Sequence, residues 1–271
     1  MLKNRIAFGV LFAAAAVLFS GCGEYEKLLK GRDFQKKYDM GVELYEEGEY
    51  AKSSTLFDQV ANIFRGTTKA DTVKYYQAKS YYGQRDYMMA GYYFSELSST
   101  YSSSVYLEES DFMIGYCYYK QSPRPELDQQ TTYQAITAMQ MFLAKHPTSE
   151  RVTECRAIIT EMSDKLVEKS YISAKLYYDL GYYKSAILAL RNSLIEYPTT
   201  RYREELLFLI LKSTYLLADG SVPSKQRERF QATVDEYFSF IGEFPEGPHT
   251  KEANRMYETS TKYLGNQNTE S

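Results

Sequence analysis

Small and large apolar residues recur along this chain at a spacing that predicts pairs of helices joined by tight turns. The pattern is clearest over residues 166–198, where Gly181 marks a turn and Pro198 ends the second helical stretch. Small residues allow two helices to approach closely, and large residues fill the space between them. The positions that carry the pattern are Ala174, Tyr177, Tyr178, Tyr183, Ala186, Leu190 and Ser193. One such pair cannot bury its own apolar face, so the pattern predicts neighbours of the same design.

Four further stretches repeat this layout in the same register. They cover about residues 34–65, 71–102, 108–147 and 204–245. Helix pairs of this length and spacing are typical of tetratricopeptide repeats. We therefore expect an all-α fold, a right-handed superhelical solenoid of five helix-turn-helix repeats closed by a C-terminal capping helix at about 249–264.

Breaks in the pattern predict how the chain is organised. The expected parts are a signal peptide (1–21), a lipidated Cys and linker (22–32), N-terminal repeats 1–3 (33–147), C-terminal repeats 4–5 with the capping helix (148–264), and a disordered tail (265–271). Residues 149–180 contain neither Pro nor Gly, which predicts one long helix, or two nearly continuous ones, joining the two groups of repeats rigidly. Repeat 3 has a longer turn, QSPRPELDQQTT, whose two Pro residues exclude helix there.

The N-terminal segment is typical of a bacterial lipoprotein precursor. Lys3 and Arg5 precede an apolar run over residues 6–19, and the segment ends in FSGC. This is similar to a lipobox, in which the Cys is lipidated and becomes the new N-terminus, so Cys22 is the expected site of lipid attachment. An ordinary signal peptide with an incidental Cys is the alternative. Gly23, where an Asp would retain the protein, permits sorting to the outer membrane.

Composition and charge exclude several classes of protein. The chain has 271 residues, of which 44% are hydrophobic, and this apolar content is too high for a disordered protein. Its net charge of −3 argues against nucleic acid as a partner, because nucleic-acid binding needs a concentrated basic face. The 28 Tyr residues fall mostly at repeat positions, where a ring can be buried while its hydroxyl stays in contact with water.

No group of residues predicts catalysis, and no cofactor or metal is expected. His146 and His249 each lie beside a Pro at a repeat boundary, without a second ligand at metal-binding spacing. Phosphate-binding loops and nucleophile motifs are absent from the sequence. Cys117 and Cys155 lie on apolar helix faces and are expected to be buried free thiols, with a disulfide as the alternative.

A row of aromatic residues falls on the expected inner face of the repeats and is the candidate substrate-binding groove. The candidate residues are Tyr38, Tyr45, Tyr75, Tyr82, Phe112, Tyr116, Tyr119 and Lys79. The row continues with Tyr171 and Tyr178 in repeat 4, and Leu209 and Leu216 take these positions in repeat 5. Two interpretations stay open: the rings bind an extended peptide that carries aromatic residues, or they pack against the next helix. Lys79 could receive a carboxylate of such a peptide.

Residues 164–200 give the chain a resemblance to a known family. DKLVEKSYISAKLYYDLGYYKSAILALRNSLIEYPTT and the preceding AKHPTSERVTE resemble the BamD (YfiO) family, lipoproteins of the outer-membrane β-barrel assembly machinery. The resemblance covers about residues 22–245. It is weaker at ANIFRGTTKA, residues 61–70, where other members carry a Tyr-Pro link.

The resemblance implies a scaffold that is anchored by lipid to the periplasmic side of the outer membrane. Its N-terminal repeats would receive unfolded outer-membrane proteins, and its C-terminal repeats would bind the periplasmic domains of the barrel-forming assembly subunit. Arg201 and Arg203, which open the link after repeat 4, are the expected partner contacts. The alternative is a tetratricopeptide lipoprotein that serves another envelope process, either cell-wall synthesis or glycan uptake.

Overall fold

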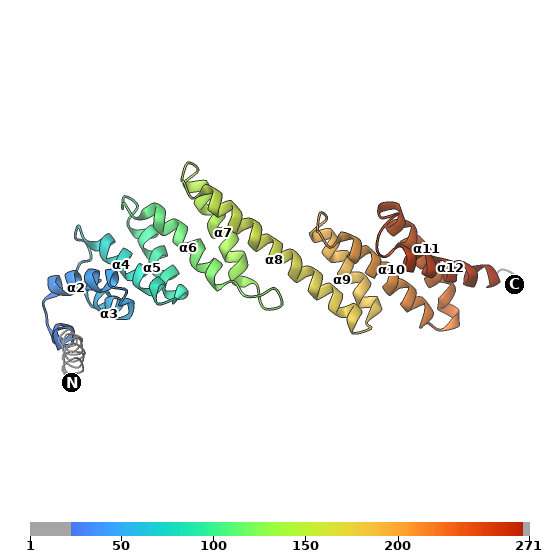
Figure 1. Ribbon diagram of the computed structural model, residues 1–271, viewed down its shortest axis with the longest axis horizontal. Helices are drawn as coiled ribbons and strands as arrows, with labels where there is room; N and C mark the ends of the chain where they lie inside the picture. Colours follow the sequence, from blue (N-terminus) through green and yellow to red (C-terminus); the bar gives the residue numbers. More distant parts are fainter. Residues whose placement is uncertain (1–22, 268–271) are drawn as a thin grey trace, which may run out of the picture. The chain divides into compact units, whose positions relative to one another are not determined.

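The computed structural model describes residues 23–267, and every regular element in that range is a helix (Figure 1). The helices are α2 (Phe34–Glu46), α3 (Tyr50–Val60), α4 (Ala70–Gly83), α5 (Tyr87–Thr100), α6 (Leu107–Gln121), α7 (Gln130–Lys145), α8 (Val152–Asp179), α9 (Tyr183–Glu196), α10 (Arg203–Asp219), α11 (Pro223–Glu243) and α12 (Thr250–Gln267). Helices α2 to α11 form five successive pairs, and α12 comes after the fifth. The predicted all-α tetratricopeptide fold is confirmed.

Contacts divide the described chain into two compact units. The first contains residues up to 122 together with 130–162, and the second contains 123–129 and the residues from 163 onward. The division falls within α8, whereas the sequence suggested a boundary after residue 147. The reason is that Cys155, Ile158 and Met162, in the first turns of α8, are buried in the core of the first unit.

The core of the first unit follows the predicted alternation of small and large residues. Ala78 and Ala90 are fully buried where α4 meets α5, and Phe94 fills the neighbouring space. A second cluster, formed by Phe57, Val60 and Val73, joins the first repeat to the second. Burying an aromatic or aliphatic side chain of this size stabilises the fold by about 1.5–3 kcal/mol, so these contacts hold successive pairs together.

Three of the turns within repeats use the left-handed backbone conformation. Gly48, Arg85 and Gly181 have φ values of 81°, 63° and 76° and occupy the same place after the first helix of repeats 1, 2 and 4. In each turn the backbone N–H of this residue donates to a carbonyl three residues earlier, which closes the helix. Glycine adopts this conformation without a steric cost, whereas Arg85 adopts it against one.

The second unit has its own core, which α12 closes. Ala186, Leu190 and Leu206 pack between α9 and α10, while Phe208 and Phe240 pack against Met256 of α12. Helix α12 continues to Gln267, so residues 265–267 are helical and not part of the predicted disordered tail. Residues 268–271 lie outside the described range.

Residues 23–30, most of the expected linker, form a helix. Leu28 is buried, and the Lys37 ammonium donates to the Leu29 carbonyl at 3.1 Å. One buried side chain and one cap therefore attach this segment to the first repeat. The expected signal peptide and Cys22 lie outside the described residues. Within the described range no helix is both long and apolar enough to span a bilayer.

Candidate functional site

An aromatic ring at one equivalent position of each repeat is covered by the residue that precedes the following helix pair or cap. The ring-centroid distances are 4.6 Å for Tyr38 with Lys69 Nζ, 4.1 Å for Tyr75 with Tyr106, 4.4 Å for Phe112 with Arg151 Cζ, 4.1 Å for Tyr171 with Tyr202, and 4.1 Å for Phe208 with His249. Cations and aromatic rings are both favourable partners for a ring face at this distance. The same packing contact therefore joins repeats 1, 2, 4 and 5 to the next repeat or to the cap, and within the first unit it joins repeat 3 to the residue that precedes α8.

This contact favours the packing interpretation for part of the aromatic row. Tyr38, Tyr75 and Phe112 face the following repeat and pack against it. In repeat 5 the equivalent ring is Phe208, so the expected Leu209 is wrong by one residue; Leu209 is buried in the core between α9 and α10 instead. The neighbouring leucines are as apolar as the ring positions, which is why the pattern alone misplaced the register.

Lys79 takes part in a polar contact beside the Tyr75 stack. Glu109 accepts hydrogen bonds from the Tyr75 hydroxyl at 2.8 Å and from Lys79 Nζ at 3.0 Å. Burial alone would raise the pKa of Glu109, but these donors hold it below its ordinary value. The pairs Tyr171–Glu205 (2.6 Å) and Lys212–Glu252 (2.7 Å) repeat parts of this arrangement. A ligand carboxylate at Lys79 would therefore have to compete with Glu109.

A second ring position connects the two helices of one repeat, except in repeat 3. The pairs are Tyr45–Tyr50 (5.6 Å), Tyr82–Tyr87 (5.4 Å), Tyr178–Tyr183 (6.1 Å) and Tyr215–Phe230 (6.1 Å). In repeat 3 a long turn connects α6 to α7, and Tyr119 has no ring partner on α7. Its hydroxyl instead donates to Glu161 of α8 at 2.9 Å. Tyr116 stands where repeats 2, 4 and 5 have Lys79, Lys175 and Lys212.

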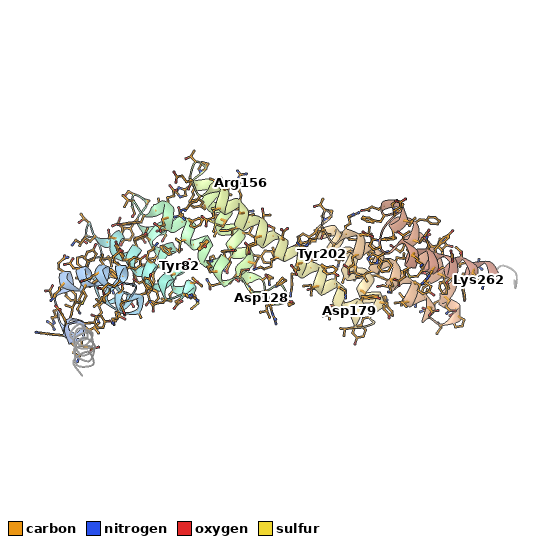
Figure 2. All side chains as sticks on the ribbon, viewed as in Figure 1. Tyr82, Asp128, Arg156, Asp179, Tyr202 and Lys262 are labelled. Carbon is orange, nitrogen blue, oxygen red and sulfur yellow. The ribbon has the colours of Figure 1, made fainter. Side chains whose placement is uncertain are left out.

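These departures create what we call the Tyr82 surface, formed by Tyr82, Tyr116, Tyr119 and Lys120. The Tyr116 ring lies 6.3 Å from Tyr82 and 5.6 Å from Tyr119, and Lys120 Nζ lies 4.9 Å from the Tyr116 ring. Among the described residues, neither the Tyr82 nor the Tyr116 hydroxyl has a hydrogen-bond partner, and Lys120 has no carboxylate partner. Burial raises the pKa of Tyr82 to about 12, so its hydroxyl stays protonated. Figure 2 marks Tyr82 within the first unit.

The expected groove residues therefore fall into two groups. The rings of Tyr38, Tyr75 and Phe112 are engaged between repeats, and Tyr45 packs on Tyr50 and Tyr76. The Tyr82 surface offers ring faces, free hydroxyls and a cation together. Such a surface can hold an extended segment that carries aromatic side chains and polar backbone groups.

The two expected partner contacts in the second unit differ in availability. Arg203 binds Glu243 through two nitrogens, and its Nη1 donates to the Pro198 carbonyl at 3.0 Å. Arg201 is more exposed; its Nη2 donates to the Tyr202 hydroxyl at 2.8 Å and lies 3.3 Å from Glu168. Arg201 also lines a cavity of about 410 Å³ beside the C-terminal end of α9. Arg201 is thus the better placed of the two for an intermolecular contact.

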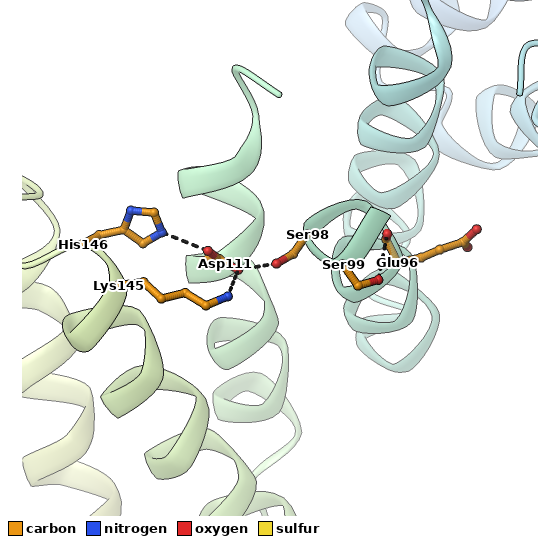
Figure 3. A network of polar contacts seen from close by, with 6 residues as sticks. All are labelled: Glu96, Ser98, Ser99, Asp111, Lys145 and His146. Carbon is orange, nitrogen blue, oxygen red and sulfur yellow. Dashed lines mark hydrogen bonds and ion pairs between the residues drawn. The ribbon is translucent and has the colours of Figure 1, made fainter. Parts of the chain in front are cut away.

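Sequence reasoning missed a buried carboxylate that connects α5, α6 and α7 (Figure 3). Asp111 accepts a hydrogen bond from the Ser98 hydroxyl, and it lies 2.8 Å from His146 Nε2 and 3.2 Å from Lys145 Nζ. Burial opposes ionisation, but these three partners hold the pKa of Asp111 below its ordinary value. The sequence feature that could have indicated a buried acid is the pair of neighbouring basic residues, Lys145 and His146, at the end of repeat 3.

The described residues hold no cluster that would bind a metal. Residues 23–267 contain no group of three or more His, Cys, Asp or Glu side chains with suitable geometry. Cys117 and Cys155 are buried free thiols, and burial raises their pKa values to about 12 and about 11. Both thiols therefore stay protonated at neutral pH, which disfavours reaction with oxidants or metals.

Comparison with known proteins decides the family. Residues 32–226 match the YfiO family, described as an outer membrane lipoprotein, and this range is well over half of the chain. This chain belongs to the YfiO family. A protein of Aquifex aeolicus (strain VF5), provisionally named outer membrane protein assembly factor BamD, is 27% identical over 222 residues, covering 81% of this chain and 72% of that protein.

A solved structure also aligns with this YfiO-family chain. The TPR2AB domain of yeast Sti1, solved as a pHSP90 complex, is 14% identical and aligns with a TM-score of 0.39. The alignment covers 84% of this chain and 98% of that one.

Proposed function

We propose that this protein is a non-catalytic adaptor lipoprotein of outer-membrane β-barrel protein assembly. The observation that carries the proposal is the match to the YfiO family over residues 32–226. The name of the Aquifex relative, an assembly factor, supports the same role. In this role the lipid at Cys22 holds the chain on the periplasmic side of the outer membrane, and the repeats offer binding surfaces.

The first unit would receive unfolded outer-membrane proteins on the Tyr82 surface. Two facts support this choice: the hydroxyls of Tyr82 and Tyr116 lack partners among the described residues, and Lys120 has no carboxylate partner there. An extended segment could place aromatic side chains on these rings and a carboxylate near Lys120. The stacked rings of Tyr38, Tyr75 and Phe112 would keep the surface in place without contacting the ligand.

The second unit would bind the periplasmic domains of the barrel-forming subunit, with Arg201 as the main contact. Arg201 lines the cavity beside α9 and contacts Glu168 through one nitrogen at 3.3 Å, whereas Glu243 holds the less exposed Arg203 through two nitrogens. Arginine at an interface can form paired hydrogen bonds with a carboxylate, which gives it a large share of binding energy.

The broad proposal is tested by affinity purification of the lipidated chain from detergent-solubilised outer membranes, with partners identified by mass spectrometry. A large β-barrel protein with periplasmic domains is the expected partner. Recovery of cell-wall synthases or glycan-uptake proteins in its place would reject the proposal and favour the alternative envelope role.

The substrate surface is tested separately by titrating an aromatic-rich peptide from a barrel protein's terminal strand. Replacing Tyr82 and Tyr119 by Ala is expected to weaken binding at least tenfold, because central aromatic contacts are often each worth about 2 kcal/mol. The matched control replaces Tyr177 and Tyr182, two exposed tyrosines of the second unit, by Ala. Unchanged affinity in the first variant, or an equal loss in the control, would remove the Tyr82 surface from the proposal.

A further inference from the structure

The end of the described chain that lies next to the lipidation site differs in charge from the rest of the protein. Residues 23–37 contain five basic and three acidic residues, a net charge of +2. Residues 38–271 contain 25 basic and 32 acidic residues, a net charge of −7. An anionic surface would therefore repel most of this chain and attract only its N-terminal end.

Three basic residues near the start of the described chain matter most here. Lys27, Lys30 and Arg32 are exposed, and none of them has an ion-pair partner among residues 23–267. Lys36, in contrast, is bound to Glu24 at 2.7 Å, and Lys37 is buried with Gln59. Three available cations thus lie within six residues of one another.

The fold places two of these cations, Lys27 and Arg32, at a concavity, and Lys30 lies on the same helix outside its lining. A cavity of about 480 Å³ lies between the helix at residues 23–30 and the start of α2. Three basic residues (Lys27, Arg32 and Lys36) and two acidic residues (Glu24 and Asp33) line it, together with Gly23, Leu28 and Gly31. The Tyr25 hydroxyl contacts the Lys52 carbonyl at 3.4 Å, and Leu28 is buried, so the helix is attached to the first repeat. Because Glu24 is paired with Lys36, Lys27 and Arg32 face only Asp33 as an unpaired acid, so the lining carries a net positive charge that favours a phosphate-bearing headgroup.

We infer that the helix at residues 23–30 and its cavity bind the headgroups of anionic phospholipids. The inference rests on the lipoprotein character of the family and on Cys22 as the lipidated residue. Gly23 lines the cavity and follows Cys22 directly, and consecutive Cα atoms are about 3.8 Å apart. The acyl chains on Cys22 therefore bring the cavity to the level of the headgroups. Lys27, Lys30 and Arg32 then hold the first repeat against the bilayer and orient the chain on it.

The test uses the mature chain with Cys22→Ser, so that only the protein surface can bind lipid. Binding to vesicles of 30% phosphatidylglycerol in phosphatidylcholine is measured by co-sedimentation and compared with pure phosphatidylcholine. The anionic vesicles are expected to bind the protein and to release it at high salt. A basic residue near an anionic bilayer contributes about fivefold in affinity, so the variant Lys27→Gln, Lys30→Gln, Arg32→Gln is expected to bind about 100-fold more weakly.

The matched control removes the same charge from an exposed helix of the second unit. It carries Lys251→Gln, Arg255→Gln and Lys262→Gln on α12, and circular dichroism verifies that both variants are folded. The control is expected to bind like the parent. Absence of binding by the parent, equal binding to both vesicle types, or an equal loss in the two variants would each overturn the inference. None of these outcomes depends on the partner or substrate of the proposed function.

Discussion

The junction between repeat 5 and α12 lacks a side-chain hydroxyl that the junctions between repeats have, and adding one should stabilise the protein. Before each of the first helices of repeats 2 to 5, a Ser or Thr accepts a hydrogen bond from the backbone N–H two residues later. These residues are Thr67, Ser104, Ser149 and Thr200. Ser104 also donates to Asp71 at 2.7 Å, and Ser149 donates to Glu108 at 2.6 Å. Before α12 the equivalent residue is Gly247, which has no side chain.

The missing hydroxyl leaves a carboxylate oxygen without a partner. Glu204 occupies the position of Asp71 and Glu108, and its Oε1 atom is buried with no hydrogen-bond partner. The backbone at Gly247 matches the other junctions, because its carbonyl accepts from Thr250 N at 3.2 Å as the Ser104 carbonyl accepts from Leu107 N at 3.1 Å. A Ser at this position would therefore direct its hydroxyl toward Glu204.

The size of the effect is set by three contributions to the free energy of unfolding. Satisfying a buried acceptor is worth about 1–3 kcal/mol, and replacing Gly by a residue with a side chain contributes about 0.4–1 kcal/mol through the unfolded state. The new Cβ would lie too close to Glu204 Oε1, so the carboxylate must rotate, which costs about 0.5–1.5 kcal/mol. We expect Gly247→Ser to stabilise the second unit by about 1–2 kcal/mol.

Urea unfolding followed by circular dichroism measures this change as a shift of the midpoint at constant slope. Gly247→Ala serves as the first control, because it adds the Cβ without the hydroxyl and should give little or no gain. Glu204→Met serves as the second, because it removes the acceptor, so that Ser and Ala at position 247 should then be equally stable. A Ser variant no more stable than the Ala variant would refute the reasoning about the junction.

Three further predictions concern a turn, a buried carboxylate and the partner contact. Arg85→Gly should stabilise the first unit by about 0.5–1 kcal/mol, because it removes the steric strain of a non-glycine residue in the left-handed conformation. Urea unfolding measures the change, and a lower free energy of unfolding would contradict the prediction. The pKa of Asp111 is lower in the folded state than in the unfolded state. Its ionised carboxylate therefore stabilises the fold above about pH 4, the pKa of Asp in the unfolded chain, and this stabilisation is lost as the pH falls through the lower pKa of the folded state. Asp111→Asn should therefore flatten the acid side of a stability-against-pH curve, and an unchanged slope would contradict this. Arg201→Glu should reduce co-purification of the barrel-forming subunit more than Arg203→Glu, since Arg203 is occupied by Glu243; equal losses would contradict the ranking.

The sequence was sufficient to predict the helix pairs, because close packing of small and large residues imposes a spacing that can be read directly. It was not sufficient to separate packing from binding in the aromatic row. The residues that cover the rings are Lys69, Tyr106, Arg151, Tyr202 and His249, which are chemically diverse and share only a position. For the same reason the buried Asp111 was missed, since its partners are Ser98 on α5, Lys145 at the end of α7, and His146 just after it. The helix at residues 23–30 was not predicted, because a single buried residue, Leu28, gives no periodic hydrophobic pattern.

The ring contact also explains where the stack of repeats ends. A further repeat after α12 would need an aromatic ring five residues from the start of that helix, as in Tyr75, Phe112 and Phe208 for α4, α6 and α10. That position in α12 is Arg255, which is exposed, so α12 presents a charged face where each earlier helix presents a ring. At the other end, Asp33 precedes α2 where a ring-covering Lys, Tyr, Arg or His precedes the later helices, and its side chain caps α2 instead. Neither terminal helix therefore offers this contact to a further repeat: Arg255 provides no ring to be covered, and the Asp33 carboxylate would be repelled by the negative face of a ring.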